Sequence, residues 1–155
     1  MTAVLPKWQE VFVEQVGLIA DVGFPRSAAR VLALLVVCEP KNQSADQLQA
    51  TLKLSAGTVS AAVRILVKGE IVTRTTFPGD RRIYYQLHPD GWPRLLRTRL
   101  QLLTQVRHVA EDALAAGGDQ VDERLVAMRD FYARCEAQFV QLLDELVETS
   151  RASRA

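Results

Sequence analysis

The chain has 155 residues, of which 48% are hydrophobic and 24% are charged, with two cysteines and a formal net charge of +1. Its length suits one domain, and its composition excludes a disordered or collagen-like chain and a scaffold held by several disulfides. The longest apolar run, residues 31–38, is far shorter than a membrane span and no secretion signal begins the chain, so we expect a cytoplasmic protein with no membrane partner.

The charged residues are unevenly distributed along the chain. Residues 24–94 carry ten basic and five acidic side chains, or +5, whereas residues 1–23 and 95–155 each carry −2. A basic segment between mildly acidic arms is typical of a nucleic-acid-binding module on a scaffold that has another role. The small overall charge therefore does not exclude a nucleic-acid-binding protein.

Two helices are predicted at the start of the chain. Apolar residues that include Trp8 and Phe12 recur at steps of three and four and predict a first helix that ends near Gly23. A second helix, over residues 25–38, is apolar nearly all round and should lie in the core. It ends before Pro40, because the residue before a proline disfavours helix.

Two shorter helices with capping signals come next. Ser44 and Gln47 have the spacing of a capping box, which predicts a helix over residues 45–51. Ser55 can cap a further helix that runs to about Lys68, with Gly69 as its stop. Two short helices joined by a tight turn make a helix-turn-helix.

The two faces of the Ser55 helix differ in chemistry. Four apolar residues between 59 and 66 share one face, which should pack against the core. The opposite face is small near the helix start and basic further on, which suits close approach to a DNA groove, although such a face can also simply be solvated. Arg64 can reach a guanine edge or a phosphate. The candidate DNA contacts on this helix are Ser55, Gly57, Thr58, Ser60, Ala61, Arg64 and Lys68.

A β-hairpin is predicted after this helix. Residues 70–76 and 83–87 are rich in β-branched and aromatic residues, and Pro78-Gly79 stands where a type II turn requires it. Arg81 and Arg82 beside the tip suit entry into a narrow minor groove, and Asp80 can hold one of them in position. With Arg74 in the first strand, they complete the candidate DNA contacts.

The ordered motifs Leu54-Ser55-Ala56-Gly57-Thr58-Val59-Ser60, Gly69-Glu70-Ile71-Val72 and Pro78-Gly79-Asp80-Arg81-Arg82 resemble the winged-helix domain of MarR-type transcriptional regulators, and more closely their GbsR-like branch. The resemblance implies a homodimeric repressor or activator, with the Ser55 helix in the major groove and the hairpin as the wing. Asp80 and Arg82 match the Asp-x-Arg of the family's wing, which gives Arg82 the minor-groove role.

The last third of the chain predicts two long helices. The first runs from about Asp90 to Gly117-Gly118. In the second, apolar residues are spaced alternately by four and three, which is the period of helices that pack along their length. This seam exceeds what one small domain needs to cover itself, so we expect a homodimer, with packing inside one chain as the alternative. The residues predicted to dimerise are Val121, Leu125, Met128, Tyr132, Phe139, Leu142 and Leu146.

The sequence thus predicts a mainly α fold with a small β-hairpin wing, a winged helix-turn-helix flanked by long dimerisation helices. Its parts are an N-terminal helix of the dimerisation region (1–23), the DNA-binding domain (24–90) and the C-terminal dimerisation helices (91–155). The predicted partners are palindromic double-stranded DNA and a second copy of the chain. A winged helix used for protein contact and a non-specific architectural DNA-binding protein are the alternatives.

No enzyme motif and no group of metal ligands is recognisable, so we expect no catalytic residue, metal or cofactor. Cys38 and Cys135 are more typical of small core residues than of redox sensors. The resemblance also implies a small-molecule effector between the DNA-binding and dimerisation parts, where four aromatic residues are expected to converge, although such aromatics are more often plain core. These four are Trp8, Phe12, Trp92 and Tyr132.

Overall fold

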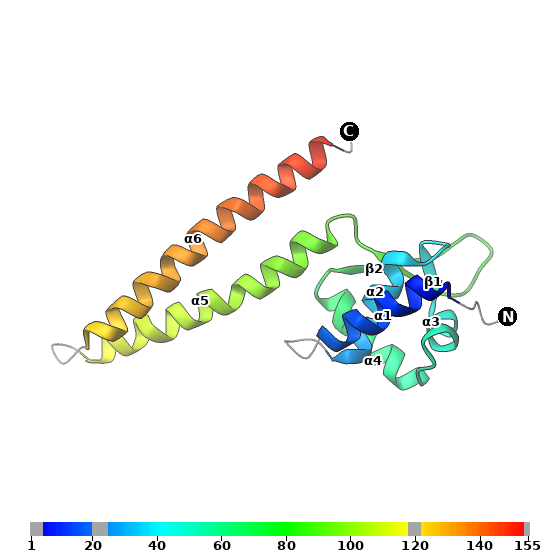
Figure 1. The fold of residues 1–155 in the computed structure, drawn as a ribbon, viewed down its shortest axis with the longest axis horizontal. Helices are drawn as coiled ribbons and strands as arrows, with labels where there is room; N and C mark the ends of the chain where they lie inside the picture. The colour runs from blue at the N-terminus through cyan, green and yellow to red at the C-terminus, as the bar shows by residue number, and fades with distance from the viewer. Residues whose placement is uncertain (1–4, 20–24, 118–121, 154–155) are drawn as a thin grey trace. The chain divides into compact units, whose positions relative to one another are not determined.

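The structure, a computed structural model, describes residues 5–19, 25–117 and 122–153 (Figure 1). The chain divides into two compact units, Met1–Gly91 and Trp92–Ala155. The first unit holds four helices and a small antiparallel sheet, and the second holds two long helices. This mainly helical architecture with a small sheet confirms the predicted fold class.

The first unit has the element order of a winged helix. Its three strands form one sheet in which β3 is central and pairs antiparallel with β1 on one side and β2 on the other. The β2–β3 hairpin forms the wing. In chain order the elements are α1 (Lys7–Ile19), α2 (Arg26–Val37), β1 (Asn42–Ser44), α3 (Ala45–Leu52), α4 (Ala56–Lys68), β2 (Val72–Thr75) and β3 (Tyr84–Leu87).

The sequence does not predict β1, whose three residues are all polar. The strand forms because it pairs with β3, with Ser44 opposite Tyr84. Ser44 then caps α3: its hydroxyl accepts the Gln47 N–H at 3.3 Å, and the Gln47 side chain accepts the Ser44 N–H at 2.7 Å. The predicted capping box is therefore confirmed, and it joins the sheet directly to the helix-turn-helix.

The core of the first unit is built around α2, which contacts both α1 and α4. Val31 and Leu34 of α2 are buried, together with Leu48 of α3, Leu66 of α4 and Ile71 beyond it. These side chains come from α2, α3, α4 and the segment after α4, so burial of apolar area fixes the helix-turn-helix onto one body. The predicted core position of α2 is confirmed.

α1 packs through a different face from the predicted stripe. Val13 is 2% exposed, whereas Trp8 is 62% exposed. Gly17 lies so close to α2 that a Cβ there would come within 2.8 Å of the Arg30 Cγ. Glu14, on the same side of the helix, forms an ion pair with Arg30 at 2.6 Å. A small residue and an ion pair thus select the packed face, and the aromatic stripe is left uncovered within this chain.

The second unit is an antiparallel pair of helices, α5 (Gly91–Gly117) and α6 (Glu123–Ala152), which lie side by side (Figure 1). Arg97 of α5 bonds Asp144 of α6, and further along α5 both Thr104 and Arg107 bond Glu136 of α6. The buried apolar side chains among the described residues of this unit are Ala110, Leu143 and Val147. Such a small core leaves most of the apolar surface of both helices open.

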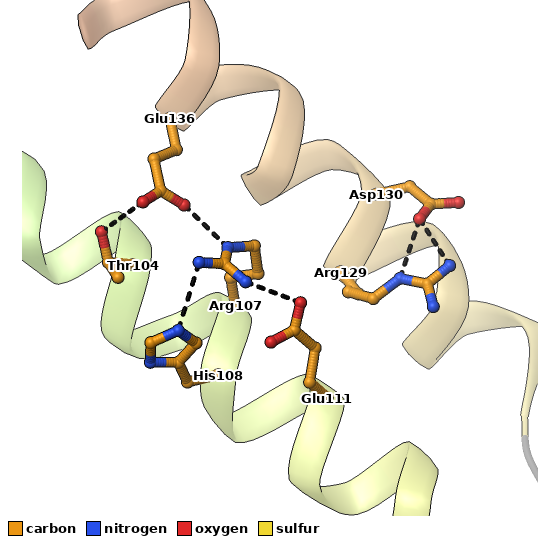
Figure 2. Close-up of polar contacts among 7 residues, drawn as sticks. All are labelled: Thr104, Arg107, His108, Glu111, Arg129, Asp130 and Glu136. Atoms are coloured by element: carbon orange, nitrogen blue, oxygen red, sulfur yellow. Dashed lines mark hydrogen bonds and ion pairs between the residues drawn. The ribbon is translucent and has the colours of Figure 1, made fainter.

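A polar cluster centred on Arg107 joins the two helices (Figure 2). Its Nε donates to Glu136 of α6 and its Nη1 to Glu111, each at 2.7 Å, and Glu136 also accepts the Thr104 hydroxyl at 2.7 Å. The Nη2 lies 3.2 Å from Nε2 of His108, which must be the acceptor because a guanidinium only donates. The bond from Arg107, and then that from Thr104, lower the pKa of Glu136.

Candidate nucleic-acid interface

The start of α4 is fixed by its own side chains. The Ser55 hydroxyl accepts the Thr58 N–H at 3.1 Å and lies 2.7 Å from the Thr58 hydroxyl. Both residues are among the candidate DNA contacts, and in the structure the Ser55 hydroxyl caps α4 while the Thr58 hydroxyl bonds that cap. Their first contribution is therefore to hold the N-terminal turn of α4 in place.

The two faces of α4 divide as expected. Val59, Ala62, Val63 and Leu66 are buried, which confirms the predicted packing face. Ile65, which belongs to neither the predicted packing face nor the candidate contacts, is a large apolar side chain that is 37% exposed. The exposed candidate contacts on the opposite face are Gly57, Ser60, Ala61, Arg64 and Lys68.

The tip of the wing has the predicted turn. Gly79 has a φ of 80°, and the Asp80 N–H donates to the Phe77 carbonyl at 3.1 Å. A positive φ at the third turn residue is what a type II turn requires, and glycine adopts it without strain. The turn places Asp80 at the start of the returning chain, where its carboxylate faces Arg82.

Asp80 and Arg82 form the most ordered polar cluster of the wing. The carboxylate accepts from Nε and Nη2 of Arg82 at 2.7 to 3.1 Å, from the Arg82 N–H at 2.9 Å and from the Tyr84 hydroxyl at 2.7 Å. These bonds, with those from the Arg82 side chain largest, hold the pKa of Asp80 well below its usual range. The guanidinium also lies 5.5 Å from the centre of the Tyr84 ring. Arg82 is therefore braced before anything binds it.

Four other basic candidates are uncommitted. They are exposed, and none makes a side-chain hydrogen bond or ion pair within residues 5–19, 25–117 and 122–153. Their charges are therefore available to an anionic partner. They are Arg64, Lys68, Arg74 and Arg81.

The charge count of the sequence overstates the basic surface of this unit. Arg26 and Arg30 fall in the segment of net +5, but both pair with Glu14 of α1, at 3.3 and 2.6 Å. Their charges are thus largely neutralised at the joint between α1 and α2. The uncommitted basic side chains among the candidate contacts lie instead on α4 and on the wing.

The residues predicted to dimerise lie on a side of α6 that α5 covers only partly. Leu142 and Leu146 are 50% and 55% exposed, whereas their neighbours Leu143 and Val147 are buried. Of the other seam residues, Met128 and Phe139 are exposed, Leu125 and Tyr132 are half-buried, and Val121 lies outside the described residues. The exposed Phe131, also on this side, is missing from the predicted seam. Phe139, Leu142 and Leu146 also line an apolar cavity with Leu96 and Leu100 of α5, so the seam borders the side of α6 that faces α5 and is only partly covered by it.

The structure does not bring Trp92 and Tyr132 together as an effector site requires. Trp92 lies fifteen residues before Arg107 on α5, or about 22 Å at 1.5 Å per residue, whereas Tyr132 is one turn from Glu136, the partner of Arg107. Antiparallel packing of the helices keeps the two aromatics at different levels. An apolar cavity of about 280 Å³ does lie between α5 and α6, but its lining contains none of the four predicted aromatics. Trp8 and Phe12 belong to the other unit.

Other candidate chemistry is sparse in the part of the chain that the structure describes. No three His, Cys, Asp or Glu side chains there gather as a metal ion requires. Cys38 is buried and burial raises the pKa of its thiol, while Cys135 is half-buried. No single described helix is long and apolar enough to cross a membrane, and α3 with α4 pass that test only as a pair bent by 115°.

Known proteins match both units of this chain. Residues 22–83 match the family model of the MarR family, and residues 90–149 match that of the MmpR5-like MarR family transcriptional regulators. The HTH-type transcriptional regulator MmpR5 of Mycobacterium tuberculosis is 35% identical over 129 residues, which cover 81% of this chain and 78% of that protein. The crystal structure of a transcriptional regulator has a TM-score of 0.76 at 31% identity and covers 90% of this chain and 98% of its own.

Proposed function

The chain belongs to the MarR family of transcriptional regulators, and we propose that it binds palindromic double-stranded DNA sequence-specifically as a cytoplasmic homodimer. In this proposal α4 enters the major groove and the wing places Arg82 in the adjacent minor groove. Occupation of a promoter by the dimer would exclude the polymerase, so we propose that the protein is a repressor. No catalytic activity is proposed.

One observation carries the DNA-binding assignment. Arg64 and Lys68 lie on the exposed face of α4 without a side-chain hydrogen bond or ion pair to the described residues. The neighbouring wing presents Arg82, which is held in place by the Asp80 carboxylate. Uncommitted cationic side chains bind phosphates, and a guanidinium on a helix can form paired hydrogen bonds with guanine. Because β1 ties the sheet to α3, helix and wing belong to one body and can engage adjacent grooves together.

The homodimer is supported by apolar surface that one chain leaves open. Besides the seam on α6, Leu102 and Val109 of α5 are 62% and 66% exposed. Exposed apolar side chains in such number are typical of an association site in soluble proteins. A two-fold axis would let the same stripes of two copies cover each other. Trp8 and its neighbours on α1 are a further exposed stripe, which we assign to the same region.

Selection of bound sequences from a random pool of double-stranded DNA tests the proposed function. A two-fold dimer presents two equivalent recognition helices, so the selected site should be a palindrome with half-site centres about one helical turn, or roughly 10 base pairs, apart. A selected site that is one asymmetric block bound by a single protomer would contradict the symmetric arrangement.

Two competing functions give different results in the same assay. A winged helix used for protein contact would enrich no DNA sequence at either of two salt concentrations, whereas phosphate contacts weaken steeply with salt. A non-specific architectural protein would be displaced from the selected site by excess random DNA. Run-off transcription from a promoter that carries the site distinguishes repression from activation.

Two finer predictions stay open within this function. The GbsR-like branch stays a prediction, because the matched subfamily model is MmpR5-like. A small-molecule effector also stays a prediction, and the separation of Trp92 from Tyr132 leaves the predicted aromatic site without support within one chain.

A further inference from the structure

At two positions of the helix-turn-helix, the residue present is not the type that the backbone conformation favours. Lys53, in the turn between α3 and α4, has a φ of 53° and a ψ of 45°, in the left-handed region where glycine or asparagine is favoured. Gly57 lies within the first turn of α4, where alanine is favoured because glycine loses more backbone entropy on folding. For the fold alone, a glycine at 53 and an alanine at 57 would be better choices.

Contacts within the described residues explain neither choice. Lys53 is exposed, and its side chain makes no hydrogen bond or ion pair in the part of the chain that the structure describes. A Cβ added at Gly57 would meet no atom within 4 Å. Gly91 differs, since a Cβ there would come within 2.9 Å of the Ile71 carbonyl oxygen. The space beside Gly57 opens outward, toward whatever lies against α4.

The two positions flank Ser55, the cap of α4, so both lie at the end of the helix that leads into the groove in the proposed function. A lysine here adds a point charge that suits a phosphate oxygen. A missing side chain lets the helix backbone approach closely. DNA lying against this turn would therefore explain both the lysine at 53 and the glycine at 57.

We propose that Lys53 binds a backbone phosphate of the DNA and that Gly57 is the point where α4 approaches the DNA most closely. This inference rests on the proposed function and adds to it a contact, Lys53, that was not among the candidates from the sequence. At both positions the chain gives up stability of the free protein in favour of affinity. Replacing either residue with a type that its backbone conformation favours should therefore raise the stability of the free protein and lower its affinity for DNA.

The test uses the full chain with the substitutions Lys53→Asn, Gly57→Ala and Gly57→Leu. Lys7→Asn is the matched control, because it removes one lysine from an exposed ion pair on α1, outside the helix-turn-helix. The thermal midpoint of each variant is measured without DNA. Affinity for the selected operator is measured at about 50 and 200 mM salt, a range over which phosphate contacts lose much of their strength.

Lys53→Asn should keep or raise the thermal midpoint and weaken binding by roughly tenfold at about 0.1 M salt, with a salt slope smaller by about 1 for each protomer. Gly57→Ala should raise the midpoint and weaken binding, and Gly57→Leu should weaken binding further because its side chain is larger. The control should bind like the wild type.

The outcomes separate this inference from the proposed function. If Lys53→Asn lowers the midpoint and leaves affinity unchanged, the lysine only complements the C-terminal end of α3 and the inference fails. Gly57 variants that bind as tightly as the wild type would overturn the close approach. A wild-type protein that selects no DNA overturns the proposed function itself.

Discussion

The Asp80 carboxylate and the Arg82 guanidinium are joined by three hydrogen bonds of 2.7 to 3.1 Å, and the Arg82 N–H adds a fourth to the same carboxylate. Nε and Nη2 of Arg82 are thereby committed, and Nη1 is left for a partner. Because the geometry is set in advance, less side-chain entropy is lost when Arg82 binds.

Replacing Asp80 with asparagine should weaken DNA binding, although it removes a negative charge near the DNA. Net charge alone predicts tighter binding, whereas loss of the brace should cost about 1 kcal/mol, the usual cost of ordering one long side chain. Affinity for the operator measured by fluorescence anisotropy decides between them. Asp112→Asn, at an exposed position of α5, is the control for charge. Tighter binding by Asp80→Asn would show that preorganisation of Arg82 is unimportant.

Arg64 and Arg82 should differ in what they recognise, although replacing either with alanine should weaken binding. In the proposed function Arg64 reaches base edges from α4, so its loss should cost about 1 to 3 kcal/mol and relax preference at one position of each half-site. Loss of Arg82 should weaken related sequences nearly uniformly and flatten the salt dependence. The measurement is the affinity of each variant for the operator and its single-base variants at two salt concentrations.

Ser60, on the same face of α4, serves as an internal comparison for Arg64. Ser60→Ala should show a smaller effect of the same kind, because one neutral hydrogen bond contributes less than a paired contact with a charged group. If Arg64→Ala leaves base preference unchanged while Arg82→Ala alters it, the proposed placement of helix and wing is wrong.

Aspartate at both Leu142 and Leu146 should convert the protein to a monomer. Both side chains are about half exposed within one chain, so burying two carboxylates in the proposed interface is costly, and the buried Leu143 and Val147 beside them are left unchanged. Sedimentation at micromolar concentration measures the effect. Ala137→Asp with Gln141→Asp adds the same two charges at exposed positions off the seam. A wild type that is already monomeric at this concentration contradicts the prediction.

Glu136→Gln should destabilise the protein at neutral pH and have little effect in acid. Bonds from Arg107 and Thr104 lower the pKa of Glu136. A carboxyl group with a lowered pKa contributes stability above its ordinary pKa of about 4.3, and this contribution is lost as the pH falls through the lowered value. The difference in thermal midpoint from the wild type should therefore shrink between about pH 7 and pH 3.

Glu148→Gln is the control for this pH dependence, because Glu148 is exposed on the same helix and makes no hydrogen bond or ion pair with the described residues. Protein concentration must be held constant, since a dimer's midpoint depends on it. A difference between Glu136→Gln and wild type that is equal at both pH values would mean that packing, not charge, is responsible.

The sequence predicted those elements whose signals are local. The caps Ser44 and Ser55 mark the starts of α3 and α4, and a Pro-Gly pair marks the wing tip. β1 carries no such signal, because pairing with β3 alone makes it a strand. The predicted first wing strand began too early, since Glu70 has a φ of 55° and β2 starts at Val72.

Helical periodicity identified apolar faces but not what covers them. On α1 the aromatic stripe is the stronger pattern, yet Gly17 and the Glu14–Arg30 pair select the opposite face for packing on α2. On α6 the most regular seam is exposed, and Leu143 and Val147 beside it are buried. A single sequence does not reveal whether such a face meets its own chain or a second copy.

The proposed phosphate contact of Lys53 is one that composition does not reveal. Its neighbours in sequence are two leucines, so it resembles an ordinary solvated lysine. Only its left-handed backbone shows that the position would accept glycine or asparagine more readily.

Ser44 belongs to two elements at once, as the residue opposite Tyr84 in the sheet and as the cap of α3. A displacement of the wing is therefore passed through one residue to the helix-turn-helix. The wing and the helix-turn-helix cannot move independently of each other. In the proposed function the first unit therefore keeps the distance between its contacts in the two grooves constant. A target whose grooves are spaced differently must bend or twist to fit, so the stiffness of base pairs that the protein never touches becomes part of what it recognises.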